Sequence, residues 1–300
     1  MNWLWLLPLC LSVNASLTPG NHSLNVEVQG ATRSCLVHVP PTYDIKRPTP
    51  VVLVFHGAMM NAERMVSFCG LNEKADQAGF VAVYPNGTGW RQFLFFNSGG
   101  LDGRLAQIRS DDVKFVTKLL DDLQAQVNVD RKRVYATGMS NGAMMCYRLA
   151  AELSDRIAAI APVSGTLAIE KCEPQRPVPV MHFHGTEDTL VRFHGPDNQS
   201  RTFIWYKSVE DTIQIWAKID GCPDTAVITE EPNTTADGTR VTKKTYGPGK
   251  DGAEVILFVI EGGGHTWPGR DPTRRFLGAT TRNISANDLI WEFFERHPLP

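Results

Sequence analysis

One pentapeptide in the sequence has the residue types and the spacing of an activated nucleophile. Gly138-Met139-Ser140-Asn141-Gly142 is a G-x-S-x-G motif, and it lies between a β-rich segment and an apolar segment typical of a helix. A serine at a sharp strand-to-helix turn has a strained backbone, and Cβ atoms two residues away would collide with neighbouring elements, so the chemistry requires both glycines. The motif predicts Ser140 as a nucleophile; an ordinary glycine-rich turn is the alternative.

A serine hydroxyl attacks efficiently only when a histidine accepts its proton and a carboxylate orients that histidine. In proteins with this serine motif, the acid and then the base follow the serine along the chain. Asp188 ends a His-Gly-Thr-Glu-Asp segment directly after an apolar run of strand length, and His265 follows a triple glycine after a later run of the same kind. The order therefore predicts Ser140 as nucleophile, Asp188 as acid and His265 as base.

Other residues offer rival assignments at the acid and base positions. Glu187 is the rival acid because it neighbours Asp188, and His194 is the main rival base. A metal site is a further alternative, since His182 and His184 alternate on one strand and would point the same way, with His194 or Asp188 completing the ligands. The assignment of Asp188 to a catalytic serine site already explains the turn that begins at His184. We therefore expect no metal and no cofactor.

The oxyanion that forms during ester attack requires backbone N–H donors that are fixed in advance. One donor normally follows the nucleophile, and the other lies in the turn after an early strand. Asn141 follows Ser140, and His56-Gly57-Ala58 closes the early apolar strand, where Gly57 permits close approach. We expect the N–H groups of Asn141 and Ala58 to form the oxyanion hole.

Aromatic residues near the predicted site indicate how a substrate would bind. Trp267 lies two residues after the predicted base, and Trp90 precedes the aromatic run 93–96 in a long loop at 88–109. An aromatic wall would suit a substrate that presents apolar surface with few hydrogen-bonding groups. We expect Trp267 and Trp90 to bind substrate, whereas packed core is the alternative for 93–96.

The elements that must position these residues alternate along most of the chain. Continuous apolar runs are typical of strands that are covered on both faces. Repeated strand–helix units build a mostly parallel central sheet with helices on both faces, so the sequence predicts an α/β fold in one catalytic domain, 24–300. Predicted strands lie at 24–39 (a hairpin turning at Gly30), 51–55, 80–84, 133–137, 157–163, 178–183, 226–229, 240–246 and 254–260, and predicted helices at 62–78, 113–127, from the serine motif to 153, 208–219 and 286–296.

Composition excludes several classes of protein. Of the 300 residues 42% are hydrophobic and 21% charged, values typical of a globular protein and unlike those of disordered or coiled-coil chains. Lys and Arg number 30 against 32 Asp and Glu, a net charge of −2 without a basic stripe. This balance gives no support to nucleic-acid binding or to an anionic membrane surface, and no obligate protein partner is implied.

The first fifteen residues, 1–15, resemble a signal peptide. Trp3 to Val13 is an apolar run of the length of a signal-peptide core, and cleavage after Ala15 would follow a small residue. No Lys or Arg precedes the run, and a buried first strand is the alternative. No other stretch approaches the roughly 18 uncharged apolar residues that a membrane span requires, so we expect a secreted protein, extracellular or periplasmic.

The cysteines leave their pairing open. Removal of residues 1–15 would leave an odd number of them, Cys35, Cys69, Cys146, Cys172 and Cys222, and therefore at least one free thiol. Cys172 and Cys222 lie in loop-like sequence at the ends of a long connection, which favours their pairing, whereas Cys146 lies in an apolar helical stretch. No CxxC motif occurs, so a structural zinc site is not expected.

Five segments taken together resemble a known family. They are Phe55-His56-Gly57, Gly138 to Gly142, Ala161 to Gly165, Pro177 to Asp188 and Gly262 to Gly269. In this order the chain, from position 26 to the C-terminus, resembles secreted polyhydroxybutyrate depolymerase-like and feruloyl esterase proteins of the α/β-hydrolase superfamily. The joint occurrence of these motifs is far more specific than any single one.

The resemblance implies that Ser140 is the nucleophile, Asp188 the acid and His265 the base. It also implies a disulfide between Cys172 and Cys222, because the family has a cysteine before the His-Gly-Thr-x-Asp strand and another in an Asn-Gly-Cys-like turn. The chain departs from the family at 97–101, where many relatives carry adjacent cysteines. That loop borders the expected cleft, so the resemblance does not fix the substrate.

We therefore expect a secreted serine hydrolase of carboxylic esters that forms an acyl-enzyme. Its substrate would be a polyester such as poly(3-hydroxybutyrate), oligomers of that polymer, or a feruloyl ester of a plant polysaccharide. A serine peptidase is an alternative, because the same fold and triad also serve peptide bonds. A non-catalytic hydrolase-like binding protein is the alternative from another class, and the intact residues Ser140, Asp188 and His265 argue against it.

Overall fold

The computed structural model describes residues 16–101, 110–197, 204–271 and 275–300. The predicted signal segment 1–15 lies outside the described residues, as do positions 102–109 of the predicted long loop. Within the described ranges no helix is long and apolar enough to cross a membrane.

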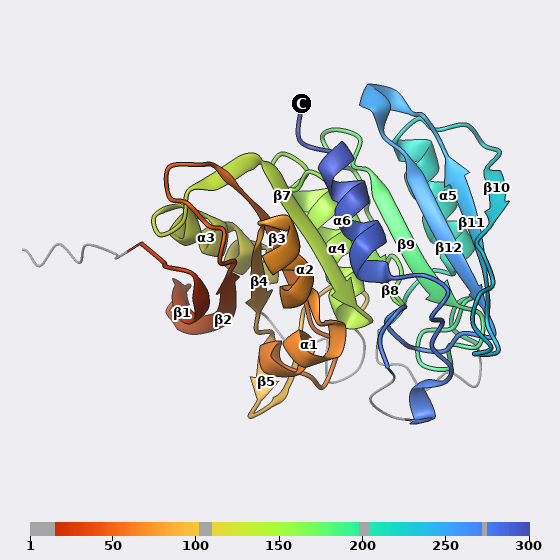
Figure 1. The fold of residues 1–300 in the computed structure, drawn as a ribbon, viewed down its shortest axis with the longest axis horizontal. Coiled ribbons are helices and arrows are strands. Elements are labelled where there is room, and N and C mark those ends of the chain that lie inside the picture. Colours follow the sequence, from red (N-terminus) through yellow and green to blue (C-terminus); the bar gives the residue numbers. More distant parts are fainter. Residues whose placement is uncertain (1–15, 102–109, 198–203, 272–274) are drawn as a thin grey trace, which may run out of the picture.

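A ten-stranded sheet runs through the described part of the molecule (Figure 1). From one edge to the other its strands are β1 (Gly20–Val28), β2 (Ala31–Val39), β4 (Val81–Pro85), β3 (Thr49–Phe55), β7 (Val129–Met139), β8 (Ile160–Val163), β9 (Val180–Gly185), β12 (Val255–Glu261), β11 (Arg240–Tyr246) and β10 (Val227–Glu230). Neighbours from β4 to β12 pair in parallel, and the strands at both edges pair antiparallel. The predicted mostly parallel sheet is confirmed.

Helices cover both faces of this sheet, as the sequence predicts (Figure 1). Buried residues of α1 (Ala62–Cys69), α2 (Leu71–Ala78) and α6 (Ala286–Arg296) form one core cluster with the sheet. Buried residues of α3 (Asp112–Gln124), α4 (Asn141–Glu152) and α5 (Val209–Ile219) form the other. The sheet therefore separates two hydrophobic cores.

The strand β3 shows why the central strands are apolar throughout. Val51, Leu53 and Phe55 belong to the core beneath α3 and α4, and the alternate residues Val52 and Val54 belong to the core beneath α1 and α6. Successive side chains of a strand point to opposite faces, so a strand with helices on both sides has no position for an exposed polar residue.

The single helix predicted at 62–78 is wrong, because two helices occupy this range. Gly70 ends α1 and precedes α2 with φ 61° and ψ 27°, a left-handed conformation that breaks a helix. A Cβ at Gly70 would lie 2.4 Å from the Arg270 guanidinium carbon, so a side chain here would also meet a residue far along the chain. The helical periodicity of the sequence continues across Gly70, and it hides the break.

The predicted loop at 88–109 begins with a short hairpin of β5 (Thr88–Trp90) and β6 (Phe93–Phe95). Leu94 of this hairpin exchanges backbone hydrogen bonds with the turn after β3: Met59 N donates to Leu94 O at 2.8 Å, and Leu94 N donates to Met60 O at 3.1 Å. The hairpin is therefore fastened next to the predicted oxyanion turn, His56-Gly57-Ala58.

The parallel strands bring the predicted site residues to one edge of the sheet. His56 follows β3, Ser140 follows β7, Asp188 lies three residues beyond β9, and His265 lies four residues beyond β12. Carboxyl ends of parallel strands meet at the same edge, where α/β proteins place their sites.

The packing of α6 against the sheet yields a stability prediction. Phe294 is fully buried, and its ring stacks on that of Tyr135 in β7 with 4.5 Å between centroids. Phe294→Ala should lower the free energy of unfolding by about 3–5 kcal/mol, because it removes buried area and leaves a cavity. Glu295→Ala, at the exposed neighbouring position, is the control and should change it by less than about 0.5 kcal/mol. Urea denaturation measures both, and equal effects would contradict this packing.

Candidate active site

Ser140 has a backbone conformation that side-chain-bearing residues rarely adopt. Its φ is 58° and its ψ is −121°, between the last residue of β7 and the first residue of α4. A Cβ at Gly142 would lie 2.3 Å from the Phe55 carbonyl oxygen, and one at Gly138 would lie 2.7 Å from the same atom. Both glycines of the motif are therefore required by the close approach of β3, as the sequence predicts.

Asp188 and His265 form a buried side-chain pair at this edge of the sheet. His265 Nδ1 lies 2.7 Å from Asp188 Oδ2, and both side chains are buried. Asp188 Oδ1 accepts hydrogen bonds from the backbone N–H groups of Leu190 at 2.9 Å and Val191 at 2.8 Å. Burial alone would raise the pKa of Asp188, but the adjacent His265 and the Val191 N–H hold it below its ordinary value, so the carboxylate is ionised.

The loop that carries His265 is held by its backbone. His265 N donates to Leu277 O at 2.6 Å, and Gly264 N donates to Ala279 O at 2.9 Å. A Cβ at Gly264 would lie 2.1 Å from Leu277 O, so the glycine before the histidine allows this contact. The Ser140 hydroxyl is partly exposed and makes no hydrogen bond to His265 among the described residues, which is common before substrate binds.

The rival acid and base lie elsewhere. Glu187 is exposed, whereas its neighbour Asp188 is buried against His265. The His194 side chain is 81% exposed and lies 3.7 Å from Glu210. The geometry thus favours Asp188 and His265 for the triad.

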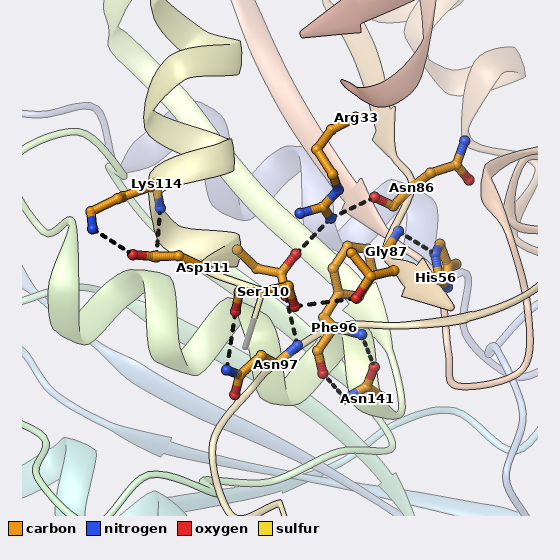
Figure 2. Close-up of polar contacts among 12 residues, drawn as sticks. Arg33, His56, Asn86, Gly87, Phe96, Asn97, Ser110, Asp111, Lys114 and Asn141 are labelled. Atoms are coloured by element: carbon orange, nitrogen blue, oxygen red, sulfur yellow. Dashed lines mark hydrogen bonds and ion pairs between the residues drawn. The ribbon is translucent and has the colours of Figure 1, made fainter. Parts of the chain in front are cut away.

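The turn after β3 is fixed by a buried histidine. His56 Nε2 accepts a hydrogen bond from Gly87 N at 3.0 Å (Figure 2). The ring proton therefore lies on Nδ1, which donates to Gly57 O at 2.8 Å. The carbonyl of Gly57 and the N–H of Ala58 belong to one planar peptide and point in opposite directions. His56 therefore orients the Ala58 N–H that we expect in the oxyanion hole.

A Cβ at Gly57 would lie 3.4 Å from Ser140 Cβ, so the turn that carries Ala58 lies next to Ser140. Asn141 begins α4 directly after Ser140, at the N-terminal end where backbone N–H groups lack partners within the helix. The structure thus places both expected donors, Ala58 and Asn141, beside Ser140.

The Asn141 side chain has a separate task that sequence reasoning missed. Its Oδ1 accepts a hydrogen bond from Phe96 N at 2.7 Å, and its Nδ2 donates to Phe96 O at 3.0 Å (Figure 2). Nδ2 also donates to Ser98 Oγ at 2.9 Å. Asn141, the residue after Ser140, therefore holds the end of the β5–β6 hairpin.

An ion pair that sequence reasoning also missed holds both ends of the same hairpin. Arg33 Nη2 donates to Asp112 Oδ1 at 2.6 Å and to Asn86 O at 2.9 Å, and the Asp112 side chain is fully buried (Figure 2). Asp112 Oδ2 accepts hydrogen bonds from Asn97 N at 2.7 Å and Ser110 Oγ at 3.0 Å. In the sequence, Asp111 and Asp112 mark only the start of a helix. The ion pair could not be predicted from them, because Arg33, the partner of Asp112, is 79 residues away.

The expected substrate role of Trp267 is wrong. Its side chain is 1% exposed in the core beneath α6, and its Nε1 donates to Asn287 Oδ1 at 2.8 Å. The Pro268 carbonyl accepts the Ala286 N–H at 3.1 Å, so the start of α6 covers the tryptophan. Trp90, by contrast, is 67% exposed at the end of the β5–β6 hairpin.

The structure does not show the expected Cys172–Cys222 disulfide: both side chains are free thiols. Cys222 is buried, its thiol donates to Ala253 O at 3.8 Å, and a Cβ at Gly249 would lie 2.8 Å from its sulfur. Cys35, Cys69 and Cys146 are free and buried as well. Burial raises the pKa of Cys35 and Cys69 to about 12, so these thiols are unreactive.

The two histidines of the metal alternative are occupied by hydrogen bonds. His182 Nε2 lies 3.0 Å from His184 Nδ1, and His184 Nε2 lies 2.7 Å from Val191 O. Among the described residues no group of three His, Cys, Asp or Glu side chains has the arrangement of a metal site.

Comparison with known proteins gives a consistent result. The family model described as Esterase PHB depolymerase matches residues 33–193, more than half of the chain. "Putative esterase NocK" of Nocardia uniformis subsp. tsuyamanensis is 32% identical over 286 residues, covering 89% of this chain and 80% of the relative. Feruloyl esterase B of Piromyces equi is 29% identical over 240 residues, covering 78% of this chain but only 42% of the relative.

A solved structure supports the fold. The acetyl xylan esterase from Aspergillus awamori has a TM-score of 0.61 and 16% sequence identity, with 91% of this chain and 99% of that chain covered. Together with the sheet order, this likeness confirms the α/β-hydrolase fold that the resemblance implied.

The buried His56 yields a prediction about pH. Burial lowers the pKa of His56 from 6.5 to about 4, because the charged ring would lose its hydration in the core. The nitrogen that would take the second proton, Nε2, already accepts the Gly87 N–H. In the unfolded chain the same group binds a proton below pH 6.5, so stability is fully present above that pH and falls as the pH drops toward 4. The His56 ring should thus lower the free energy of unfolding by about 3 kcal/mol between pH 6.5 and pH 4.

The measurement is the free energy of unfolding of the wild type and of His56→Gln at pH 7 and pH 4.5. The wild type should lose more stability between these pH values than the variant, which has no ionisable ring. His22→Gln, at a partly exposed histidine in β1, is the control and should keep the wild-type dependence. Parallel losses in all three proteins would refute the assignment.

Proposed function

The chain belongs to the esterase PHB depolymerase family, and from that premise we propose that it is a secreted serine hydrolase of carboxylic esters that works through an acyl-enzyme. The observation that carries the proposal is the juxtaposition of a strained serine, Ser140, with a buried Asp188–His265 pair at the same edge of the sheet. The α/β-hydrolase domain would span 24–300 and follow a signal peptide at 1–15.

The Asp188–His265 hydrogen bond sets the direction of proton transfer. The ionised Asp188 accepts the Nδ1–H of His265, so His265 Nε2 is the unprotonated nitrogen. Nε2 takes the hydroxyl proton as Ser140 Oγ attacks the ester carbonyl carbon, and it later gives that proton to the alcohol that leaves. Water repeats the sequence on the acyl-enzyme, releases the acid and restores the serine.

The tetrahedral intermediate carries a negative oxygen that needs fixed donors. The Asn141 N–H at the start of α4 and the Ala58 N–H, oriented through His56, would donate to it. Because the β5–β6 hairpin and the loop 96–98 anchor both groups, these donors need no rearrangement when the charge develops.

The exposed side chains beside this turn support a substrate with apolar groups. Met59 follows the oxyanion turn and is 57% exposed, while Trp90 and Phe93 are cross-strand neighbours at the end of the hairpin. Neighbours of this kind lie on one face of the two strands. Such a surface favours a polyester of hydroxyalkanoate units or a hydroxycinnamoyl ester over a small acetyl ester.

The triad yields the first test. Ser140→Ala, His265→Ala and Asp188→Asn should each lower kcat/KM for a short-chain nitrophenyl ester by about 10³-fold or more, because the three residues act as one unit. Glu187→Gln, at the exposed neighbour of Asp188, is the matched control and should retain activity. Loss of activity in Glu187→Gln with retention in Asp188→Asn would reverse the acid assignment. Cleavage of a peptide but of no ester would favour a peptidase.

The exposed aromatic pair yields the second test. Trp90→Ala should lower hydrolysis of a hydroxybutyrate oligomer or of methyl ferulate by about tenfold or more, since burying a large apolar side chain against substrate is worth roughly 1.5–3 kcal/mol. Hydrolysis of an acetylated sugar should change little. Val227→Ala, at an exposed apolar residue on the edge strand β10, is the control. Preference for the acetylated sugar, unaffected by Trp90→Ala, would overturn the substrate proposal.

A further inference from the structure

A chain of three buried side chains lies behind the Asp188–His265 pair. Tyr147 Oη lies 2.8 Å from His182 Nδ1, and His182 Nε2 lies 3.0 Å from His184 Nδ1. The histidine rings are nearly parallel, with 5.2 Å between centroids and 9° between planes. Tyr147 lies on α4, the helix that begins after the nucleophile, and both histidines lie on β9, the strand that leads to Asp188.

The contact between His184 and Val191 O fixes the position of the ring protons and of the Tyr147 hydroxyl proton in this network. His184 Nε2 lies 2.7 Å from Val191 O, and a carbonyl oxygen only accepts, so His184 carries a proton on Nε2. A neutral imidazole has one ring proton, so His184 Nδ1 accepts from His182 Nε2–H. His182 Nδ1 in turn accepts from the Tyr147 hydroxyl. The three hydrogen bonds therefore run in one direction: Tyr147 donates to His182, His182 donates to His184, and His184 donates to Val191 O.

Burial keeps these groups uncharged. It lowers the pKa of His182 well below its ordinary value and lowers that of His184, against the pull of Asp188 in the second case. It also raises the pKa of Tyr147 well above its ordinary value, so the hydroxyl keeps its proton. The titratable groups that act on His184 are His182, Asp188 and His265.

His184 is a potential competitor for the catalytic carboxylate. Its Nε2 lies 3.5 Å from Asp188 Oδ2, the same oxygen that accepts from His265 Nδ1 at 2.7 Å. A protonated His184 would pair with Asp188 and weaken its hold on His265. The available site for that second proton is Nδ1, which already accepts the His182 N–H.

We propose that Tyr147 and His182 are positioning residues that keep His184 neutral, with its single proton on Nε2, and so reserve Asp188 Oδ2 for His265. The inference rests on the proposed function, because it concerns the pair that would perform general base catalysis. Tyr147, His182 and His184 form a network in which each side chain donates one hydrogen bond. A fully bonded polar network fixes one arrangement of protons, whereas the loss of one partner leaves buried groups unpaired. It also explains why two histidines and a tyrosine occupy fully buried positions beside Trp216 and Phe193.

The experiment compares three variants of the full chain. His182→Phe removes the donor to His184, Tyr147→Phe removes the donor to His182, and His182→Gln retains one donor and one acceptor. Tyr135→Phe is the matched control, because Tyr135 is a buried tyrosine whose hydroxyl has no hydrogen-bond partner among the described residues. The readouts are the pH dependence of kcat/KM for a nitrophenyl ester and the ¹⁵N NMR spectrum of histidine-labelled protein, which reports the protonation of His184 directly.

In the wild type and in Tyr135→Phe, His184 should remain the neutral Nε2–H form down to pH 5. In His182→Phe and Tyr147→Phe, His184 should gain its second proton within the range of activity, and the acid limb of kcat/KM should move up by about one pH unit, a tenfold loss at acid pH. KM should change little, and His182→Gln should restore the wild-type profile.

An unchanged His184 spectrum and an unchanged pH profile in both His182→Phe and Tyr147→Phe would overturn the inference. A uniform loss at every pH, with His184 still neutral, would show a merely structural role and overturn it as well. If the wild type hydrolyses no ester, the proposed function fails, and the His184 spectra still decide whether the chain controls its protonation.

Discussion

The backbone of Ser140 is the constraint on which the site depends. A residue with a side chain holds φ 58° only where its surroundings leave no alternative, and here β3 approaches so closely that Gly138 and Gly142 tolerate no Cβ. A Cβ at Gly165 would lie 2.2 Å from the Ser140 carbonyl, so the segment after β8 closes the turn from the other side. The parallel strands β3, β7 and β8 together hold the Ser140 hydroxyl at the edge of the sheet.

Neutral histidines in buried hydrogen bonds determine much of what surrounds that hydroxyl. His56 joins the oxyanion turn to the base of the β5–β6 hairpin, and His184 lies against the carboxylate that orients His265. In both cases the ring donates to a backbone carbonyl, Gly57 O for His56 and Val191 O for His184, and this contact fixes which nitrogen carries the proton. The electrostatics of the site therefore follow from hydrogen-bond direction more than from net charge, which is −2 for the whole chain.

The sequence could predict the sheet, most helices and the strands that Ser140, Asp188 and His265 follow, because these depend on local periodicity and on short motifs. It could not predict the break at Gly70, where the contact is with Arg270, or the burial of Trp267, which depends on Asn287 in α6. The Arg33–Asp112 pair and the Tyr147–His182 contact were missed for the same reason: each joins residues far apart in the chain. The resemblance also implied a disulfide between Cys172 and Cys222, whereas the structure shows both as free thiols.

The most direct measurement of the central claim is the mass of the protein after treatment with a fluorophosphonate, followed by peptide mapping. A serine that is activated by an adjacent base reacts with this reagent at neutral pH, whereas an ordinary surface serine does not. Our account predicts one adduct per chain, on Ser140, that disappears in His265→Ala. Absence of an adduct, or an adduct on another residue with Ser140 unmodified, would contradict the claim that this strained turn carries the nucleophile.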